Sequence, residues 1–302
     1  MPDKARVQTD KALTKIERHI SAIYRKANSG IFHAWNKYMK EIEPKISSLH
    51  KAYEDAKLSG DKELIRKTGK AYGIKLREYT LKNKYYKDMV DQTAVQISHV
   101  NETALAYING QTPKIYAINY NQMALDVKGV KGYSFTIINP STVKNLITSG
   151  DISLLPKRLD IPKDIAWNIK AINSQVLQGI LQGESVDKIA SRLMNVSTMD
   201  EKSSIRNART MVTGAECKGR QDSYEKATND GIIMKKVWLA VQDEKTRDSH
   251  AELHNVEVDT DEAFNNGLMY PGDPSGDPAE FYNCRCSMKS HIIGFKKHGK
   301  TN

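Results

Sequence analysis

Apolar residues recur every three or four positions through the N-terminal third of the chain. Between Leu13 and Tyr38 they follow these steps without interruption, which is typical of an amphipathic helix. The same spacing resumes after Pro44, a residue whose ring and missing N–H disturb a helix interior. The pattern therefore predicts a long helix with a kink or a break at this proline.

A second helical pattern occupies residues 63–108, after a turn predicted at Gly60. Gly110 and Pro113 follow it, and both residue types commonly end a helix. Lysines and tyrosines fill many polar positions of the two patterns. Residues 1–110 are therefore predicted to form a helical hairpin with one apolar seam and an outer face rich in lysine and tyrosine.

The middle of the chain is less regular. Residues 133–138 have the composition of a short strand, and Asn139 is a good N-cap for a helix that continues to Ile147. Helical spacing returns over residues 163–183. Ser185 can begin a further short helix.

Thr198 opens a capping box, in which a Thr and a Glu three residues later satisfy the first N–H groups of a helix. This helix is predicted to run to about Asn229 and to end at Gly231. Residues 234–241 then have strand composition, and turns and acidic clusters fill residues 242–288.

Charge divides the chain more sharply than hydrophobicity does. The 302 residues include 46 Lys and Arg against 36 Asp and Glu, a net charge of +10. Residues 1–90 hold 21 basic and 11 acidic residues, whereas residues 91–302 hold 25 of each. A basic segment joined to a neutral body is typical of a chain in which one part meets a polyanion.

Double-stranded DNA is the polyanion that this segment is predicted to bind, without sequence preference, because no base-reading motif accompanies the basic residues. Ten of the fourteen tyrosines precede residue 121, where their rings could stack beside the lysines. One alternative is that the lysines are only solvent-exposed residues on helix faces, with no binding role. The other is that they dock on an acidic protein surface. The predicted DNA-binding residues are Lys11, Lys15, Arg25, Lys26, Lys37, Lys40, Lys67, Lys70, Lys82, Lys84 and Lys87.

The C-terminal third carries an ordered string of rarer residues. It reads W…D-x-x-T-R-x-x-H…P-G-D…N-C-R-C, and its members are Trp238, Asp243, Arg247, His250, Pro271, Gly272, Asn283, Cys284, Arg285 and Cys286. Order and spacing resemble the Mu F-like head morphogenesis family, the minor head proteins of tailed bacteriophages. Asn255 stands where that family usually has Gly, and Asn also tolerates a left-handed backbone.

The resemblance implies a non-enzymatic minor head protein that is associated with the portal vertex and the packaged genome and acts in head morphogenesis or genome delivery. It implies the portal protein as a partner, with a scaffold or major capsid protein as further partners. The implied location is the virion, inside the capsid, with host cytoplasm during assembly.

The predicted fold is mainly α with a small α+β C-terminal module. A long helical hairpin stands at the N-terminus, helices in the middle, and short strands and loops at the C-terminus. The predicted segments are a basic helical hairpin arm, an irregular connecting region, a Mu F-like module and a basic tail, at residues 1–110, 111–162, 163–295 and 296–302.

The motif includes residue types that bind zinc. His250, Cys284 and Cys286 can supply three ligands, with Asp243 or His254 as a fourth group. The alternative is that Asp243 pairs with Arg247, His250 bonds a carbonyl, and both thiols are small buried hydrophobes. Cys284 and Cys286 would face opposite sides of a strand, which disfavours one shared ion. No cofactor is expected except a structural zinc ion.

The enzymatic alternative is a metal-dependent nuclease or a toxin-like effector that uses Asp243, His250 and the two cysteines. Phosphate-binding and nucleophile-elbow motifs are absent from the sequence. No run of about 18 apolar residues occurs, so no transmembrane helix is expected. We therefore expect no membrane partner.

Overall fold

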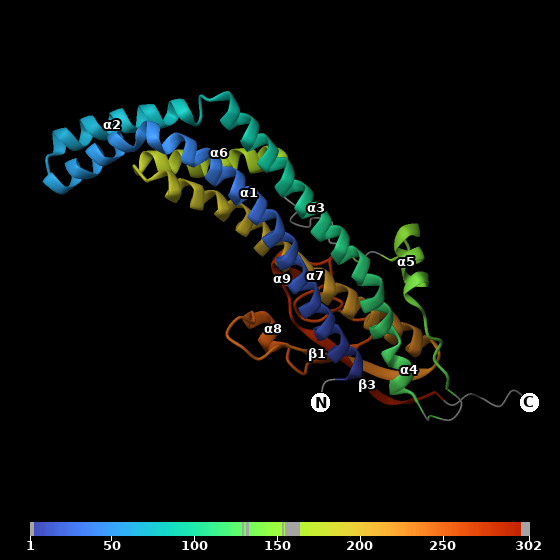
Figure 1. The fold of residues 1–302 in the computed structure, drawn as a ribbon. Coiled ribbons are helices and arrows are strands. Elements are labelled where there is room, and N and C mark those ends of the chain that lie inside the picture. The colour runs from blue at the N-terminus through green and yellow to red at the C-terminus, as the bar shows by residue number, and fades with distance from the viewer. Residues whose placement is uncertain (1–2, 129, 131–132, 153, 155–163, 297–302) are drawn as a thin grey trace, which may run out of the picture. The chain divides into compact units, whose positions relative to one another are not determined.

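A computed structural model describes residues 3–128, 130, 133–152, 154 and 164–296. The predicted basic tail lies outside these residues except for Lys296. The helices are α1 (Lys4–Ser59), α2 (Lys62–Tyr79), α3 (Lys84–Tyr120), α4 (Gln122–Asp126), α5 (Pro140–Ser149), α6 (Ile165–Leu181), α7 (Val186–Asn229), α8 (Asp248–Glu252) and α9 (Pro278–Phe281). The strands are β1 (Ile232–Leu239), β2 (Glu257–Asp259) and β3 (Ser287–Phe295) (Figure 1). The prediction of a mainly α fold with a small α+β C-terminal module is confirmed.

The chain forms two compact units, each assembled from separated segments. The sheet unit comprises residues 1–18, 105–160 and 205–302, and the helical unit comprises residues 19–104 and 161–204. Helices α1, α3 and α7 contribute residues to both units. The segments predicted from the sequence are instead continuous stretches of the chain. That these segments have separate functions stays a prediction.

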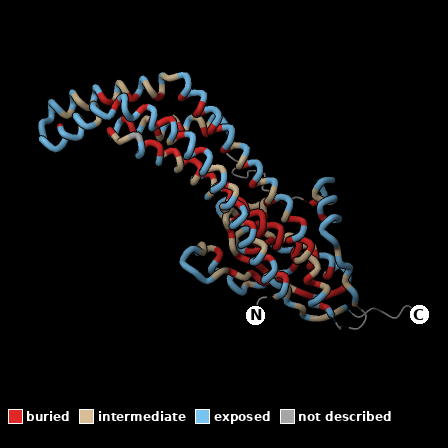
Figure 2. Tube along the Cα trace, in the orientation of Figure 1, coloured by how far each residue is buried: buried red, intermediate tan, exposed pale blue. Residues whose placement is uncertain are grey.

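The helical unit has an apolar and aromatic core. Figure 2 shows its buried positions along the inner sides of the helices and its exposed positions outside. The Trp35 indole donates a hydrogen bond of 3.0 Å to Thr93 Oγ1, and its ring meets Tyr86 edge to face at 5.6 Å. The core includes Trp35, Tyr38, Ile42, Ile46, Tyr72, Leu76, Tyr86, Val90, Ile97, Ile172, Val176 and Leu193.

Helix α1 runs through Pro44 without interruption, so a break at this proline is wrong. Ile42 and Ile46, on either side of it, are 2% and 1% exposed in the same core. Their burial offsets the single backbone hydrogen bond that proline removes.

The helix predicted over residues 63–108 is two helices, α2 and α3. Thr80 and Asn83 form the turn between them, where Asn83 Oδ1 accepts a hydrogen bond from the Tyr86 N–H at 3.3 Å. Helix α3 then continues to Tyr120, so the predicted ends at Gly110 and Pro113 are wrong. The buried residues Ile108 and Ile115 flank this stretch and keep it helical.

Residues 133–138 do not form the predicted strand. The Asn121 side chain instead makes both backbone hydrogen bonds of Ile138, accepting from its N–H at 2.9 Å and donating to its C=O at 2.8 Å. Helix α5 follows as predicted, because Asn139 Oδ1 accepts the Thr142 N–H at 2.8 Å.

Helix α6 ends before Gly183, which has a φ of 63°, as the sequence predicted. The two helices predicted at Ser185 and Thr198 are one helix, α7. Thr198 does not cap a helix, since its hydroxyl donates to the Met194 carbonyl one turn earlier. The predicted end of this helix at Gly231, with a φ of 97°, is confirmed.

The sheet unit contains a three-stranded antiparallel sheet in the order β2-β1-β3. The strand predicted from Met234 is confirmed as β1, and Trp238 pairs with Met288 of β3. Alternate positions of β1, namely Met234, Lys236 and Trp238, are buried. Phe264 and Phe281 are buried in the same cluster as Trp238, so this region has an aromatic core.

Candidate functional site

The C-terminal motif gathers around the fully buried Trp238 ring. This ring meets His250 edge to face at 5.1 Å and Phe264 at 5.0 Å. His250 lies on the short helix α8, and the cysteines lie in the loop before β3. Residues far apart in the sequence therefore converge at the C-terminal end of β1.

The two thiols face the same nitrogen of His250. Nδ1 lies 3.7 Å from Cys284 Sγ and 3.4 Å from Cys286 Sγ, while Nε2 lies 3.0 Å from a Glu280 carboxylate oxygen. The histidine and both cysteines are only 1–2% exposed. Their three potential ligand atoms all lie within 4.8 Å of one another.

The expectation that the cysteines face opposite sides is wrong, because residues 284–286 precede the strand. Asn283 has a left-handed φ of 54°, and the Cys284 N–H bonds the Phe281 carbonyl, which closes a turn. The Cys286 N–H then points at Cys284 Sγ at 3.4 Å. This turn places both sulfurs on the side that faces His250.

A hydrogen bond between the two thiol groups, separate from the contact with the Cys286 N–H, shifts their pKa values in opposite directions. Donation from Cys284 lowers the pKa of the Cys286 thiol, with His250 acting in the same sense. The same bond raises the pKa of Cys284, and burial adds to that rise. Burial keeps both sulfurs away from solvent, so neither is placed as a nucleophile for an external substrate.

The predicted pair of Asp243 and Arg247 does not form. Asp243 instead accepts two hydrogen bonds from the Arg285 guanidinium, which holds the pKa of Asp243 well below its usual value. Arg247 donates to the Tyr282 carbonyl. Asp243 and His254 are exposed and do not join the three-residue cluster, so neither is placed as the fourth ligand.

The Pro271-Gly272-Asp273 segment has a structural explanation. Gly272 has a φ of 80°, and a Cβ on it would lie 3.0 Å from the backbone nitrogen of Gly214 on α7. Asp273 accepts hydrogen bonds from the Met269 and Ser275 N–H groups at 3.0 and 2.9 Å. The segment therefore fixes a turn against helix α7. The left-handed Asn255, with a φ of 65°, agrees with the tolerance expected of asparagine there.

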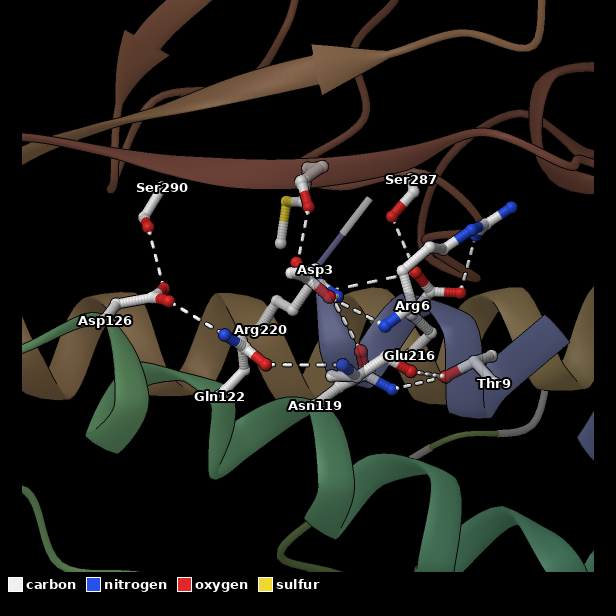
Figure 3. Close-up of polar contacts among 12 residues, drawn as sticks. Asp3, Arg6, Thr9, Asn119, Gln122, Asp126, Glu216, Arg220, Ser287 and Ser290 are labelled. Atoms are coloured by element: carbon white, nitrogen blue, oxygen red, sulfur yellow. Dashed lines mark hydrogen bonds and ion pairs between the residues drawn. The ribbon is translucent and has the colours of Figure 1, made fainter. Parts of the chain in front are cut away.

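Figure 3 shows a buried polar network that joins the start of α1 to α3, α7 and β3. The Arg220 guanidinium, 1% exposed, donates to both carboxylate oxygens of Asp3 at 2.6 and 2.9 Å and to Asn119 Oδ1 at 3.0 Å. Glu216, also 1% exposed, accepts from Arg6 at 2.7 Å and Ser287 at 2.6 Å.

Sequence reasoning missed the N-terminal half of this network. Glu216 and Arg220 stand four residues apart on a helix face, which signals a pair, but Asp3 and Arg6 are more than 200 positions away. Nothing local identifies such partners.

All eleven residues predicted to bind DNA are exposed. Within the described ranges none of the eleven forms an ion pair with an acidic side chain. Lys11 and Lys15 belong to the sheet unit, where Lys114 joins them along a groove of about 270 Å³ between α1 and α3. The other nine belong to the helical unit.

Five of the ten tyrosines that precede residue 121 do not lie on the predicted outer face. Tyr24, Tyr38, Tyr72, Tyr86 and Tyr116 are at most 5% exposed. Their rings fill the cores of the two units, so they cannot stack on bases. Tyr85, 58% exposed, is an exception.

Among the described residues, no helix combines the length and the hydrophobicity needed to cross a membrane. This agrees with the sequence, which contains no apolar run of that length.

Comparison with known proteins gives one family and two informative relatives. Residues 170–289 match the Phage Mu protein F like family. The chain is 24% identical over 284 residues to the minor head protein of Bacillus phage SPP1, a match that covers 93% of this chain and 87% of the relative. It is 34% identical over 165 residues, or 53% of this chain, to an NAD(+)–arginine ADP-ribosyltransferase of Enterococcus faecalis, of which it spans 33%.

No solved structure is significantly similar to the chain. The resemblance inferred from the motif is confirmed by the family match and by the viral relative, which extends over most of the chain. Residues 170–289 therefore form a Phage Mu protein F like region, and the chain is similar along most of its length to a phage minor head protein.

Proposed function

We propose that this protein is a non-enzymatic minor head protein of a tailed phage that associates with the portal vertex and with packaged double-stranded DNA. In this role it acts in head morphogenesis or genome delivery. The similarity to a minor head protein along 93% of the chain is the observation that carries the proposal. The location proposed with it is the inside of the capsid, after assembly in the host cytoplasm.

Exposed basic residues support the DNA part of the proposal. A phosphate backbone attracts lysines that are exposed and not already paired, and the release of counterions makes this binding sensitive to salt. Lys11, Lys15 and Lys114 line one groove and can neutralise neighbouring phosphates. Without a base-reading element, the binding is independent of sequence.

The burial of His250 and of the two cysteines supports the absence of an enzymatic role. A nuclease or toxin-like effector that used His250, Cys284 and Cys286 would have to bring its substrate to side chains that are 1–2% exposed. Incubation of purified protein with plasmid DNA and divalent metals is the direct assay. Metal-dependent nicking that disappears in His250→Ala would favour the nuclease instead.

DNA binding should be tested on the full chain. An isolated fragment 1–110 would cut α3, which continues to Tyr120, and would separate Arg6 from its buried partner Glu216. We expect micromolar binding at low salt, with log K falling by about 0.9 per phosphate contact against log salt and about four to six contacts in total.

The sharper experiment replaces Lys11, Lys15 and Lys114 together with Gln. This variant should reduce the salt slope by about two to three. The matched control replaces three other exposed lysines of the same unit, Lys144, Lys245 and Lys289, and should keep the wild-type slope. Equal losses in both variants would show that only net charge matters. No binding at about 50 mM salt would remove DNA as a partner.

The portal protein is the proposed protein partner, and a scaffold or major capsid protein is the further candidate. Co-expression followed by affinity purification of the portal protein should recover this chain in a fixed ratio. Recovery with the major capsid protein alone would place the partner elsewhere in the head.

A further inference from the structure

We propose that His250, Cys284 and Cys286 bind one zinc ion through Nδ1 and the two sulfur atoms, with Glu280 orienting the histidine. The site is independent of the proposed DNA and portal contacts. It lies wholly within the sheet unit, on residues that are far apart in the sequence.

The separations between the ligand atoms suit tetrahedral zinc. Bond lengths of about 2.3 Å to sulfur and 2.0–2.1 Å to nitrogen put neighbouring sulfur and nitrogen ligands about 3.5 Å apart. The two sulfur-to-Nδ1 distances are 3.4 and 3.7 Å, and all three atoms lie within 4.8 Å of one another. Little movement is needed for all three to reach one ion.

Hydrogen bonding around the histidine also fits a ligand. Glu280 binds Nε2 at 3.0 Å, which fixes the tautomer that leaves the Nδ1 lone pair free. The carboxylate is itself held by the Ser249 hydroxyl at 3.0 Å and by Asn266 Nδ2 at 3.3 Å. A metal-bound histidine commonly donates its other N–H to a carboxylate that is held in this way.

Without a metal, the Nδ1 atom of His250 can bond only one of the two sulfurs that face it. When Nε2 donates to Glu280, the neutral ring has one acceptor lone pair, at Nδ1, and can accept one thiol S–H. Two sulfurs nevertheless lie within 3.7 Å of this nitrogen. A single ion bound to all three atoms accounts for the convergence of both sulfurs.

Neither Asp243 nor His254 supplies a further ligand to the zinc, because neither joins the cluster. Asp243 is held by Arg285, and His254 is exposed. Burial of the three ligands distinguishes this site from an open catalytic zinc site, so the ion acts on folding.

The first experiment measures zinc in the full chain, purified without a histidine tag from zinc-supplemented cells. We expect about one zinc per chain in the wild type and almost none in Cys284→Ala or Cys286→Ala. Cys217→Ala is the matched control, since Cys217 is equally buried in the same unit but lies outside the cluster, and it should keep the zinc. A wild type without zinc, or a Cys286→Ala variant with a full complement, would overturn the proposal.

A second measurement does not depend on whether a cysteine variant folds. Cobalt added to metal-stripped wild-type protein should give a thiolate-to-cobalt charge-transfer band that zinc then removes, and no such band would contradict the site. Glu280→Gln should weaken zinc affinity by about 10–100-fold in a chelator competition. Glu257→Gln, which alters an exposed carboxylate–histidine pair with His291, should leave the affinity unchanged.

Discussion

The two units of the molecule are stabilised in different ways. The sheet unit buries charged side chains, including Glu216, Arg220 and Lys236, each with specific partners. In the helical unit Asp200 is the only described acidic or basic residue that is buried to this degree, and the other residues of its interior are apolar, aromatic or uncharged polar ones. A buried charge is tolerated only where its partners are in place, whereas apolar packing accepts many arrangements. Substitutions in the sheet unit should therefore lower stability mainly by breaking specific hydrogen bonds and ion pairs. Substitutions in the helical unit should lower it mainly by changing the volume of buried side chains.

The largest expected effect comes from the two buried tryptophans, one in each unit. Trp238→Ala and Trp35→Ala should each lower the free energy of unfolding by about 3–5 kcal/mol, because both rings are at most 1% exposed. Urea titration followed by circular dichroism measures both. A loss below about 1 kcal/mol in Trp238→Ala would show that the aromatic centre of the C-terminal motif does not hold the sheet unit together.

The next effect is a dependence of the free energy of unfolding on pH, and it arises in the sheet unit alone. Lys236 donates to Gln221 Oε1, the Thr260 carbonyl and the Met269 carbonyl, with no carboxylate among its bonded partners. Burial lowers its pKa from 10.5 to about 8. The unfolded chain therefore binds more protons between pH 8 and 10.5, and the free energy of unfolding should rise with pH across that window.

This rise should reach about 1.5 kcal/mol between pH 8 and 9.5. Lys236→Met removes the titrating group and should abolish the rise. Lys235→Met changes the neighbouring residue, which is half-buried and pairs with Asp259, and should keep it. A wild-type protein whose stability is flat over these pH values would show that Lys236 is not desolvated.

Two helical glycines provide a third comparison. A Cβ on Gly219 of α7 would lie 2.5 Å from the Tyr116 carbonyl oxygen of α3, whereas nothing lies within 4 Å of a Cβ on Gly30 of α1. Gly219→Ala should destabilise by about 1–3 kcal/mol, because a backbone atom must move. Gly30→Ala should stabilise by about 0.5–1 kcal/mol, because alanine favours the helix. Thermal unfolding measures both, and a neutral Gly219→Ala would show that α3 and α7 are not in tight contact.

Periodicity predicted most of the helices but not where they end. The apolar spacing revealed α1 and α6, strand composition revealed β1, and local caps located α5 at Asn139 and the end of α7 at Gly231. Pro44, Gly110 and Pro113 were misread because buried neighbours on both sides outweigh the local preference of one residue. Residues 133–138 do not form the expected strand. The Asn121 side chain makes the backbone hydrogen bonds of Ile138 that a neighbouring strand would otherwise make.

The candidate site was predictable in composition but not in pairing. The ordered motif identified His250, Cys284 and Cys286, and these do meet. The partners of the charged residues were wrong or unseen, because Asp243 bonds Arg285 rather than Arg247, and Arg220 bonds Asp3 at the other end of the chain. Such pairs depend on tertiary structure, which no local spacing encodes.

The smallest expected effect compares two arginines that each donate to a backbone carbonyl. Arg247 in the sheet unit is half-buried and bonds Tyr282, and Arg25 in the helical unit is exposed and bonds Ser21. Lysine keeps the charge and one donor, so Arg247→Lys should cost at most about 1 kcal/mol through a poorer hydrogen bond in a partly desolvated place. Arg25→Lys should stay within about 0.5 kcal/mol of the wild type. The melting temperatures of the two variants show whether a single polar contact contributes more to stability in the sheet unit than in the helical unit. Equal melting temperatures would mean that the two units differ only in their fully buried groups.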